Sequence, residues 1–461
     1  MAFKRLYKSE SFTIENSAKR LCCRSDSFNS FSQDVLQSIL SSSSSSSSSQ
    51  SQHDNNNNTS LIDKVNLDCL GKIFEYLNFK DRLMMEKICI KWRDASDYSW
   101  NMKNLDCTYP NICGKYGQDP VDQQDIEKIL TRSGSYLKKL KIDSKICQSS
   151  VMIIVGDYCR NLINLQIELL YYDKDDFNNV FEQLDKLEKI KIILLDNKQC
   201  TQNSYYRYDL SILQSLPSTI KKIIWQSNSL ISWFYFDKKF TQKFDNFNAL
   251  CCLSLEMCHL DKKVMKMLLK KQTITCLVLK YCKLEKEISC KFKLINLEYL
   301  DLSYSRSYYS DLTIDDLIYN VTTNSKKLKY LNIEKCQLKS KYVLYDLGKL
   351  KNLETLILNN LPDVNDDVIK GFKNLQVLNC KNCKGVTDTG IIMVLQHCDY
   401  LKNLQLEGTK ITVEALIFAS SIVDDRSTKI NMTINVDEEL MSLFFFDDKV
   451  TVSSYFNITC K

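Results

Sequence analysis

A few histidines and one pair of closely spaced cysteines are the residues with the clearest potential for chemistry. Only His259 and His397 are available for a folded site, because the third histidine lies in a polar tract, and two are too few for most His-based catalysis. Cys380 and Cys383 form a C-x-x-C pair upstream of His397 and Cys398, a set that can ligate zinc. No Ser-His-Asp set stands at a recognisable spacing, and the ten glycines form neither common phosphate-binding loop. The sequence therefore predicts a protein that is not an enzyme and uses no cofactor.

The pattern that would position these cysteines is a repeat that reads apolar-x-x-apolar-x-apolar, as in a short strand. Ten steps between first residues cover 264 residues, a mean of about 26, within the roughly 20–29 residues of a leucine-rich repeat. Helix-period segments such as 389–395 separate the strands, and no unit can bury its apolar face alone, so the units must stack. We therefore predict an α/β fold, a leucine-rich repeat solenoid or horseshoe. The eleven copies begin at Leu137, Leu162, Leu187, Ile220, Leu250, Ile274, Leu297, Leu328, Leu353, Leu375 and Leu401.

Cysteines recur at shared positions of this repeat. The unit from Leu375 to Cys398 resembles the cysteine-containing subclass of leucine-rich repeat, and the resemblance covers about residues 130–420. It implies that the ninth position turns inward, where Cys or Asn hydrogen-bonds backbone groups left free by the turn. Because this arrangement accounts for Cys380 and Cys383 without a metal, we expect no zinc site there. The ninth position holds Cys258, Cys282, Cys336 and Cys383, with Asn228 in another copy, and Cys159 and Cys398 share a second position.

Residues 61–100 have a different pattern. Leu67, Leu70, Phe74 and Leu77 recur at spacings of three and four, which predicts an apolar stripe on a short helix. Asp81 is a plausible N-cap for a second helix, and the start of a third follows. Three short helices hold too small a core to be stable alone, so we expect this segment to pack on its neighbour and to leave an apolar face for a partner.

This segment resembles an F-box. Residues 65–77 read V-N-L-D-C-L-G-K-I-F-E-Y-L, residues 87–93 read K-I-C-I-K-W-R, and Trp100 matches the closing tryptophan of that family. One departure is Asp68, which stands where the family has proline. The resemblance implies a core and adaptor-binding face made of Leu67, Leu70, Ile73, Phe74, Leu77, Leu83, Ile88 and Trp92.

The same resemblance implies a function. F-box proteins dock onto the Skp adaptor of cullin-based ubiquitin ligases, so the chain would be a substrate-recognition subunit of an SCF-type ligase. The alternative is a protein-interaction scaffold whose F-box has degenerated, with Asp68 as one sign, and no longer recruits the ligase.

Composition bears on the compartment and on the class of partner. Lys and Arg number 62 against 56 Asp and Glu, a net charge of +6 without a dense basic patch, so nucleic acid is not the expected partner. The 20 cysteines come with no apparent signal peptide and no apolar run long enough to cross a bilayer. We therefore expect free thiols in a reduced compartment, cytoplasmic or nuclear, and no membrane partner.

Four segments follow from these patterns. Residues 1–60 include the serine run 41–49 and the asparagine run 55–58, too polar to offset the entropy of ordering, and we expect a disordered tail. Residues 61–100 form the F-box, residues 101–436 the solenoid, and residues 437–461 a C-terminal cap or tail. Asn104–Cys107 resembles a degenerate first repeat, and residues 430–434 a last strand.

The concave face of the solenoid is the expected target-binding surface. Side chains between the inward strand positions face that side. Tyrosine offers large contact area at low entropy cost, and lysine suits an acidic or phosphorylated segment. Alternatively, these are ordinary strand residues, because β-propensity favours tyrosine, and the inserts 197–208 and 306–311 are rival contact sites. The candidate target-binding residues are Tyr281, Tyr299, Tyr304, Tyr330, Lys139, Lys189 and Lys191, with Lys141, Lys222, Glu256 and Glu334 nearby.

Overall fold

The computed structural model describes residues 65–75, 77, 79–100, 105–107, 123–143, 148–170, 172–195, 210–227, 233–236, 238–285, 294–307, 313–446 and 452–460. The chain divides into two units, residues 1–64 and residues 65–461. Outside the described residues lie the tail predicted to be disordered, the whole of the insert 197–208, residues 308–311 of the second insert and the position of Asn228.

Three short helices open the second unit: α3 (Leu67–Phe74), α4 (Phe79–Met85) and α5 (Ile90–Trp100). The Asn66 side chain caps α3 by accepting a hydrogen bond from the backbone N–H of Cys69 at 2.8 Å. Asp68 lies in the first turn of α3, where a carboxylate is favoured by the helix dipole. The residue that departs from the F-box pattern is therefore a good helix-starting residue.

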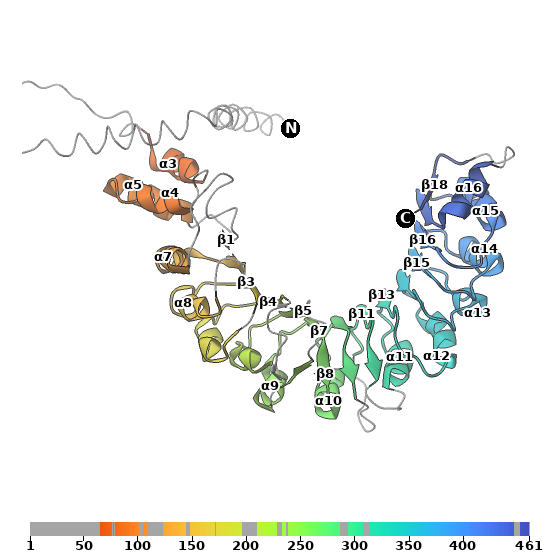
Figure 1. Cartoon of the computed structure of the whole chain (residues 1–461), viewed down its shortest axis with the longest axis horizontal. Coiled ribbons are helices and arrows are strands. Elements are labelled where there is room, and N and C mark those ends of the chain that lie inside the picture. The colour runs from red at the N-terminus through yellow and green to blue at the C-terminus, as the bar shows by residue number, and fades with distance from the viewer. Residues whose placement is uncertain are drawn as a thin grey trace, which may run out of the picture. The chain divides into compact units, whose positions relative to one another are not determined.

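Within residues 65–461 the strands line the inner side of a curved array and the helices its outer side (Figure 1). Among the described residues, fourteen strands form one sheet, each paired in parallel with its neighbours. The strands of this sheet are β1 (Leu105–Cys107), β2 (Lys139–Ile142), β3 (Asn164–Leu169), β4 (Lys189–Leu194), β5 (Lys222–Ser227), β7 (Cys252–Glu256), β9 (Cys276–Lys280), β11 (Tyr299–Asp301), β13 (Tyr330–Asn332), β14 (Thr355–Ile357), β15 (Val377–Asn379), β16 (Asn403–Gln405), β17 (Met432–Asn435) and β18 (Phe456–Thr459).

Helices return the chain between successive strands. The α-helices are α7 (Gln123–Ser133), α8 (Val151–Tyr158), α9 (Lys238–Lys243), α10 (Lys262–Lys270), α11 (Thr313–Asn324), α12 (Tyr342–Tyr345), α13 (Asp366–Ile369), α14 (Asp388–His397), α15 (Val413–Asp425) and α16 (Glu438–Phe446). Short 3-10 helices span Gly134–Tyr136, Asp175–Phe177, Val180–Gln183, Leu210–Ser215, Phe244–Asn246 and Asp346–Lys349.

The phase of the repeat is kept along the whole sheet. The fourth position of each unit pairs with the fourth position of the next, from Leu105 opposite Leu140 to Ile434 opposite Ile458. From Leu140 onward these side chains are buried, beside less buried neighbours in strands such as β3 and β4, and form one continuous core. The predicted leucine-rich repeat solenoid is confirmed. The sheet also includes β18, in the segment 437–461 for which the sequence predicted a cap or tail.

The ninth-position cysteines turn inward as predicted. Three of the four donate their thiols to the sixth-position carbonyl of the preceding repeat: Cys282 to Leu255 at 3.4 Å, Cys336 to Leu302 at 2.9 Å and Cys383 to Leu358 at 3.2 Å. Cys258 donates instead to the Glu256 carbonyl of its own repeat at 3.4 Å. A small buried side chain with a weak donor satisfies a carbonyl left free by the turn. The cysteines whose side chains are described are all free thiols.

The eighth position of the unit is where strands turn outward. In the seven units from Leu250 to Leu401 this residue has a positive φ, between 51° and 70°, a conformation that favours Gly or Asn. Gly408 has a second reason to be glycine, because a Cβ there would lie 2.3 Å from Asn382 Oδ1. The eighth residues are Met257, Tyr281, Tyr304, Lys335, Asn360, Asn382 and Gly408.

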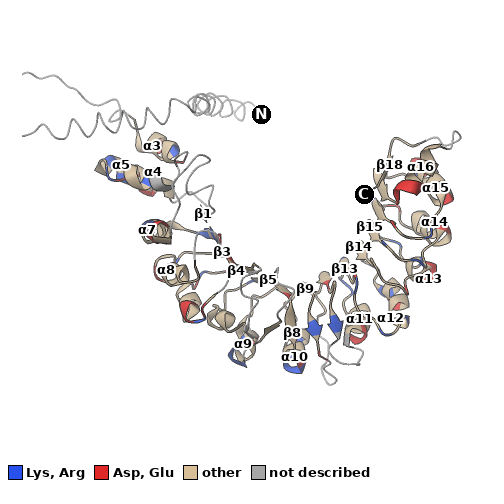
Figure 2. Cartoon of the chain, in the orientation of Figure 1, with Lys and Arg blue, Asp and Glu red and all other residues tan. Residues whose placement is uncertain are grey.

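A second, smaller sheet borders the first in the middle repeats. Its order is β12 (Arg306–Ser307), β10 (Lys283–Leu284), β8 (Cys258–Leu260) and β6 (Phe234–Tyr235), all parallel. Lys283 and Arg306 are register partners, and Figure 2 shows these basic strands in blue beside β8. Both cations lie over the Trp233 ring, at 4.3 Å and 5.3 Å from its centre, which offsets part of their mutual repulsion. The sequence repeat did not predict this sheet.

Candidate adaptor and target surfaces

The predicted F-box residues divide between a small core and an exposed surface. Leu70 and Phe74 are buried with Ala95, and the Trp92 ring contacts that of Phe74 edge-on, with 5.7 Å between centres. Leu77 packs partly against this cluster. Helices α3 and α5 approach closely at Gly71, where a Cβ would lie 2.9 Å from the Tyr98 ring.

The remaining predicted residues lie elsewhere. Leu83 packs against the core of the solenoid, and Ile88 is half-buried. Leu67 and Ile73 are 42% and 51% exposed.

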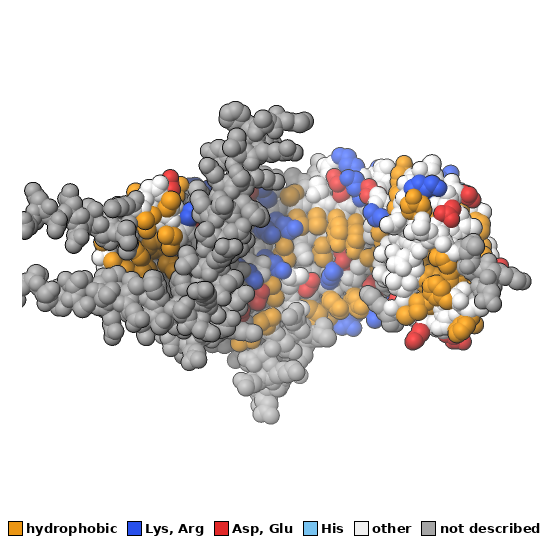
Figure 3. All heavy atoms as spheres, turned by 90° about the horizontal axis from the view of Figure 1, so that it is seen from above, with side chains coloured by type: hydrophobic (Ala, Val, Ile, Leu, Met, Phe, Trp, Pro, Cys, Tyr) orange, Lys and Arg blue, Asp and Glu red, His pale blue; other side chains and the backbone are white. Residues whose placement is uncertain are grey.

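Further apolar side chains on these helices are exposed, and the sequence prediction missed them. Met84 on α4, Ile90 at the start of α5 and Tyr98 are exposed, as are Leu67 and Ile73. Figure 3 shows hydrophobic side chains at this end of the unit. Exposed apolar side chains grouped on a small domain typically mark a protein-binding surface. The available signal was that Met84, Ile90 and Tyr98 are apolar residues outside the stripe that predicted α3.

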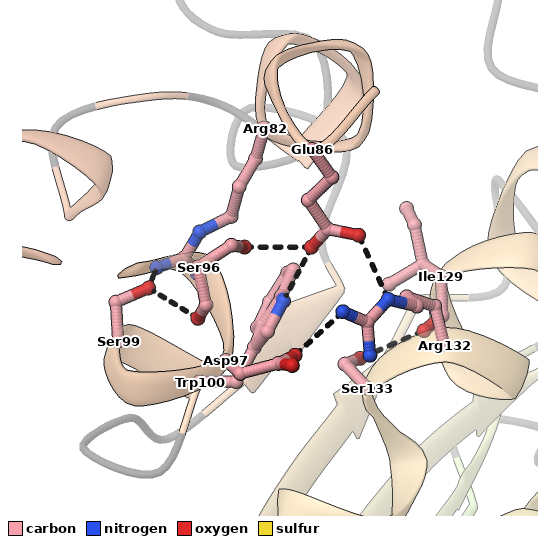
Figure 4. Close-up of polar contacts among 9 residues, drawn as sticks. All are labelled: Arg82, Glu86, Ser96, Asp97, Ser99, Trp100, Ile129, Arg132 and Ser133. Carbon is pink, nitrogen blue, oxygen red and sulfur yellow. Dashed lines mark hydrogen bonds and ion pairs between the residues drawn. The ribbon is translucent and has the colours of Figure 1, made fainter. Parts of the chain in front are cut away.

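The F-box is fixed to the first repeat by a polar network centred on Glu86 (Figure 4). One carboxylate oxygen of Glu86 accepts hydrogen bonds from Ser96 Oγ at 2.6 Å and from Trp100 Nε1 at 2.9 Å. Its other oxygen accepts one from Arg132 Nε on α7 at 2.8 Å. The Arg132 Nη2 atom donates to Asp97 at 2.5 Å. A buried carboxylate with three donors is satisfied, and its partners come from both modules.

The electrostatics of the network follow from burial and charge. Burial alone would lower the pKa of Arg132, but the hydrogen bonds and charges of Glu86 and Asp97 outweigh it and raise the pKa. Arg82 on α4 is fully buried, and its guanidinium lies 3.9 Å from the centre of the Trp100 ring. Burial lowers the pKa of Arg82 to about 10, against the opposing charges of Glu86 and Glu75. Arg82 also donates to Ser99 on α5, so it ties α4 to α5.

The four candidate tyrosines form two stacked pairs. Tyr299 and Tyr330 are register partners on β11 and β13, and their rings stack at 3.9 Å with 5° between planes. Tyr281 and Tyr304 stack at 4.6 Å, and Tyr304 donates to Glu334 at 3.0 Å. Burial, reinforced by the Glu334 contact, raises the pKa of Tyr304 to about 12, which keeps its hydroxyl protonated as a hydrogen-bond donor. Tyr299 and Tyr330 lie on strands in the middle of the sheet, whereas Tyr281 and Tyr304 lie at the eighth-position turns that follow β9 and β11.

The candidate lysines lie on the strands before the tyrosines. Lys189 and Lys222 are register partners, both at the third position of their repeats. Lys139 is at the third position on β2, and Lys191 is at the fifth position on β4. Like charges in register repel each other, so this arrangement favours an anionic partner. Figure 3 shows basic side chains next to a hydrophobic patch in the middle of the view.

The alternative zinc interpretation is not supported by the geometry. Cys380 and Cys383 are buried, whereas His397 is exposed and its Nδ1 contacts the Met393 carbonyl at 2.7 Å. Cys398 donates to the Phe372 carbonyl at 3.4 Å. Within the described residues, no three Asp, Glu, His or Cys side chains are arranged to bind a metal ion. The described helices include none long and apolar enough to span a membrane.

A family model for the F-box domain matches residues 62–104. EEED8.10 of Caenorhabditis elegans, described as an RNA-binding protein, is 20% identical over 371 residues, which cover 74% of this chain and 49% of that protein. The chain thus spans about half the length of this curated relative.

Solved structures to which the chain is similar include three with modest superposition. Internalin InlF of Listeria monocytogenes has 14% identity, covers 76% of this chain and 95% of its own, and gives a TM-score of 0.45. The yeast Rad7–Elc1 complex has 14% identity, coverage of 95% and 97%, and a TM-score of 0.41. The leucine-rich repeat protein LIC12759 of Leptospira interrogans has 16% identity, coverage of 76% and 88%, and a TM-score of 0.41. The matched domain and the unbroken repeat phase together show that the chain carries an F-box domain followed by a leucine-rich repeat solenoid.

Proposed function

We propose that this chain is the substrate-recognition subunit of an SCF-type ubiquitin ligase, working in the cytoplasm or the nucleus. In this proposal the F-box binds a Skp-type adaptor, which links it to a cullin, and the inner face of the solenoid binds a protein target. The observation that carries the proposal is the matched F-box, whose helices expose Leu67, Ile73 and Ile90 while Glu86 holds them on α7.

The proposed mechanism is not catalytic. A receptor bound to adaptor and target raises the effective concentration of the target's lysines at the ubiquitin-loaded enzyme. This requires the adaptor-binding helices to keep a defined direction relative to the inner face. The Glu86–Arg132 contact supports this requirement, because it joins the two modules through buried, charge-assisted hydrogen bonds.

The chemistry of the inner face supports an acidic or phosphorylated target segment with an apolar anchor. The lysines of β2, β4 and β5 present positive charge, and one stacked tyrosine pair, Tyr299 with Tyr330, follows on β11 and β13. Aromatic anchors beside a charged region are typical of binding hot spots.

The proposal is tested by comparing proteins bound in cells to the full chain and to an Ile73→Asp, Ile90→Asp variant. We expect the variant to lose adaptor and cullin but to keep the targets, which then accumulate. The matched control is Ile153→Asp on α8, because Ile153 is 48% exposed, close to Ile73, but lies on the solenoid. Loss of adaptor from the control as well, or its retention by the double variant, would contradict the proposal.

The scaffold alternative predicts a different result from the same experiment. A degenerate F-box would leave the wild-type chain without adaptor and cullin, yet with the same set of other partners. Because the C. elegans relative is described as an RNA-binding protein, the captures are done with and without ribonuclease. Loss of partners after ribonuclease treatment would indicate that RNA mediates their capture, and would favour RNA over a protein segment as the ligand of the inner-face lysines.

A further inference from the structure

Two cysteines meet on the inner face, between the lysines and the tyrosines. Cys252 on β7 and Cys276 on β9 are register partners, and Lys222 on β5 is the register partner of Cys252 on its other side. One row of third positions therefore runs Lys189, Lys222, Cys252, Cys276 and onward to Tyr299. This pair is distinct from the inward, ninth-position cysteines that stabilise the turns.

The surroundings of the pair differ from those of the structural thiols. Cys252 has the Cys276 thiol as its neighbour on one adjoining strand and the Lys222 ammonium group as its neighbour on the other. Cys258 and Cys282, by contrast, are fully buried and donate to backbone carbonyls. A thiol beside a cation and a second thiol has the surroundings of a reactive cysteine, whereas a buried thiol among apolar groups is inert.

The neighbouring thiol and the nearby lysines act in the same direction on Cys252. The Cys276 thiol lowers the pKa of Cys252 to about 7, helped by the positive charges of Lys222 and Lys189 and opposed by burial. The Cys252 thiol, together with burial, raises the pKa of Cys276. The titratable groups that face the pair are Lys222 and Lys189 from the strands on one side, neighbouring Cys251, and Tyr299 from the strand on the other.

We propose that Cys252 and Cys276 form a hydroperoxide-reactive dithiol site, in which Cys252 attacks and Cys276 resolves. The Cys252 thiolate attacks one peroxide oxygen, so that an S–O bond forms, the O–O bond breaks and the departing oxygen takes a proton to leave as alcohol or water. The Cys276 sulfur then attacks the Cys252 sulfenic acid, so that an S–S bond forms and hydroxide leaves with the Cys276 proton as water. The two thiols lose two electrons and the peroxide gains them.

Access sets the class of reagent. Cys252 is only 7% exposed and Cys276 is half-buried, so the site suits a small peroxide better than a bulky oxidant. The proposal concerns the chemistry of this chain alone and does not rest on the proposed ligase function.

In the test, the purified full chain is treated with limiting hydrogen peroxide at pH 7. It is then unfolded in a denaturant that contains N-ethylmaleimide, which blocks the remaining free thiols, and the cysteines are mapped by mass spectrometry. We expect a Cys252–Cys276 disulfide before any other oxidation, with Cys258 and Cys282 still reduced. Cys276→Ser should trap a sulfenic acid at Cys252 that reacts with dimedone, and Cys252→Ser should leave Cys276 reduced.

Two further measurements separate reactivity from simple access. Lys222→Met should slow the reaction at pH 7 several-fold, with less effect at pH 9, because more of the thiol is then ionised without the cation. The exposed F-box thiols Cys69 and Cys89 are internal controls for access. If they oxidise as fast as Cys252, or if the disulfide forms only after unfolding, the proposal is wrong.

Discussion

Arg132 Nε on the first solenoid helix donates to the Glu86 carboxylate of the F-box across 2.8 Å. The two residues are 46 positions apart in the chain, and their contact joins the F-box to the solenoid. The carboxylate is almost fully buried, whereas the Arg132 side chain is 31% exposed and has Asp97 as a second partner. We therefore expect the loss of stability to differ between removal of Arg132 and removal of Glu86.

The first prediction concerns this asymmetry. Arg132→Met leaves the buried Glu86 carboxylate without its ion-pair partner and should destabilise the junction by about 3 kcal/mol. Glu86→Gln leaves a partly hydrated Arg132 that still has Asp97, and should cost about 1–2 kcal/mol. Hydrogen exchange of α4, α5 and α7 measures the effect locally, because solenoids do not always unfold in one step.

The control for this prediction is an exposed pair of the same type. Lys221 and Glu188 lie 2.7 Å apart with both side chains largely in solvent, so Lys221→Met should cost less than about 0.5 kcal/mol. A cost for Glu86→Gln larger than for Arg132→Met would contradict the account of the junction.

The second prediction concerns the eighth position. Gly408→Ala should destabilise the last repeats by about 1–3 kcal/mol, because φ is +70° and the new Cβ would meet Asn382 Oδ1. Asn382→Ala in the same chain should restore only part of the loss, since the φ strain remains. Faster hydrogen exchange in β15–β17 is the expected observation.

Gly348→Ala is the matched control for Gly408→Ala. A Cβ at Gly348 would approach nothing closer than 3.8 Å, and the site has no positive φ, so the change should be neutral or slightly stabilising. Equal effects of the two substitutions would show that the turn does not require glycine.

The third prediction concerns the stacked tyrosines. Tyr299→Ala with Tyr330→Ala should remove target proteins from captures, while Tyr299→Phe with Tyr330→Phe should retain most of them, because ring stacking is preserved. Adaptor binding should be unchanged in both variants. Full retention of targets by the alanine pair would direct attention to the inserts 197–208 and 306–311 instead.

The fourth prediction concerns charge on the inner face. Changing Lys139, Lys189 and Lys191 to Glu should weaken the binding of acidic or phosphorylated targets. The affinity of the wild-type chain for these targets should fall as the salt concentration is raised. The control changes Lys262, Lys263 and Lys270 to Glu, which alters net charge equally on the exposed part of α10. Equal losses in the two variants would mean that the effect is one of total charge.

The repeat phase was readable from the sequence because it depends on local periodicity. Leu140, Leu165 and their equivalents had to be inward for any unit to bury its apolar residues, and Cys383 had to follow them into the turn. In the F-box, the spacing of Leu70 and Phe74 was enough to predict the core of α3.

The remaining features depend on contacts that periodicity does not encode. Glu86 and Arg132 look like ordinary surface charges until α4 and α7 are placed side by side. The Cys252–Cys276 pair arises from the register of β7 and β9. The second sheet, β6–β8–β10–β12, forms where the chain continues beyond the turns of the middle repeats. Ile90 was missed because exposure depends on which face of α5 its neighbours cover.

The central claim is tested most directly by measuring the affinity of the purified full chain for a purified Skp-type adaptor. We predict a one-to-one complex that weakens about a hundredfold or more in the Ile73→Asp, Ile90→Asp variant, since burying each isoleucine contributes roughly 1.5–3 kcal/mol. Ile153→Asp should bind like the wild type. No binding by the wild-type chain, or equal binding by the double variant when it is folded, would contradict the account.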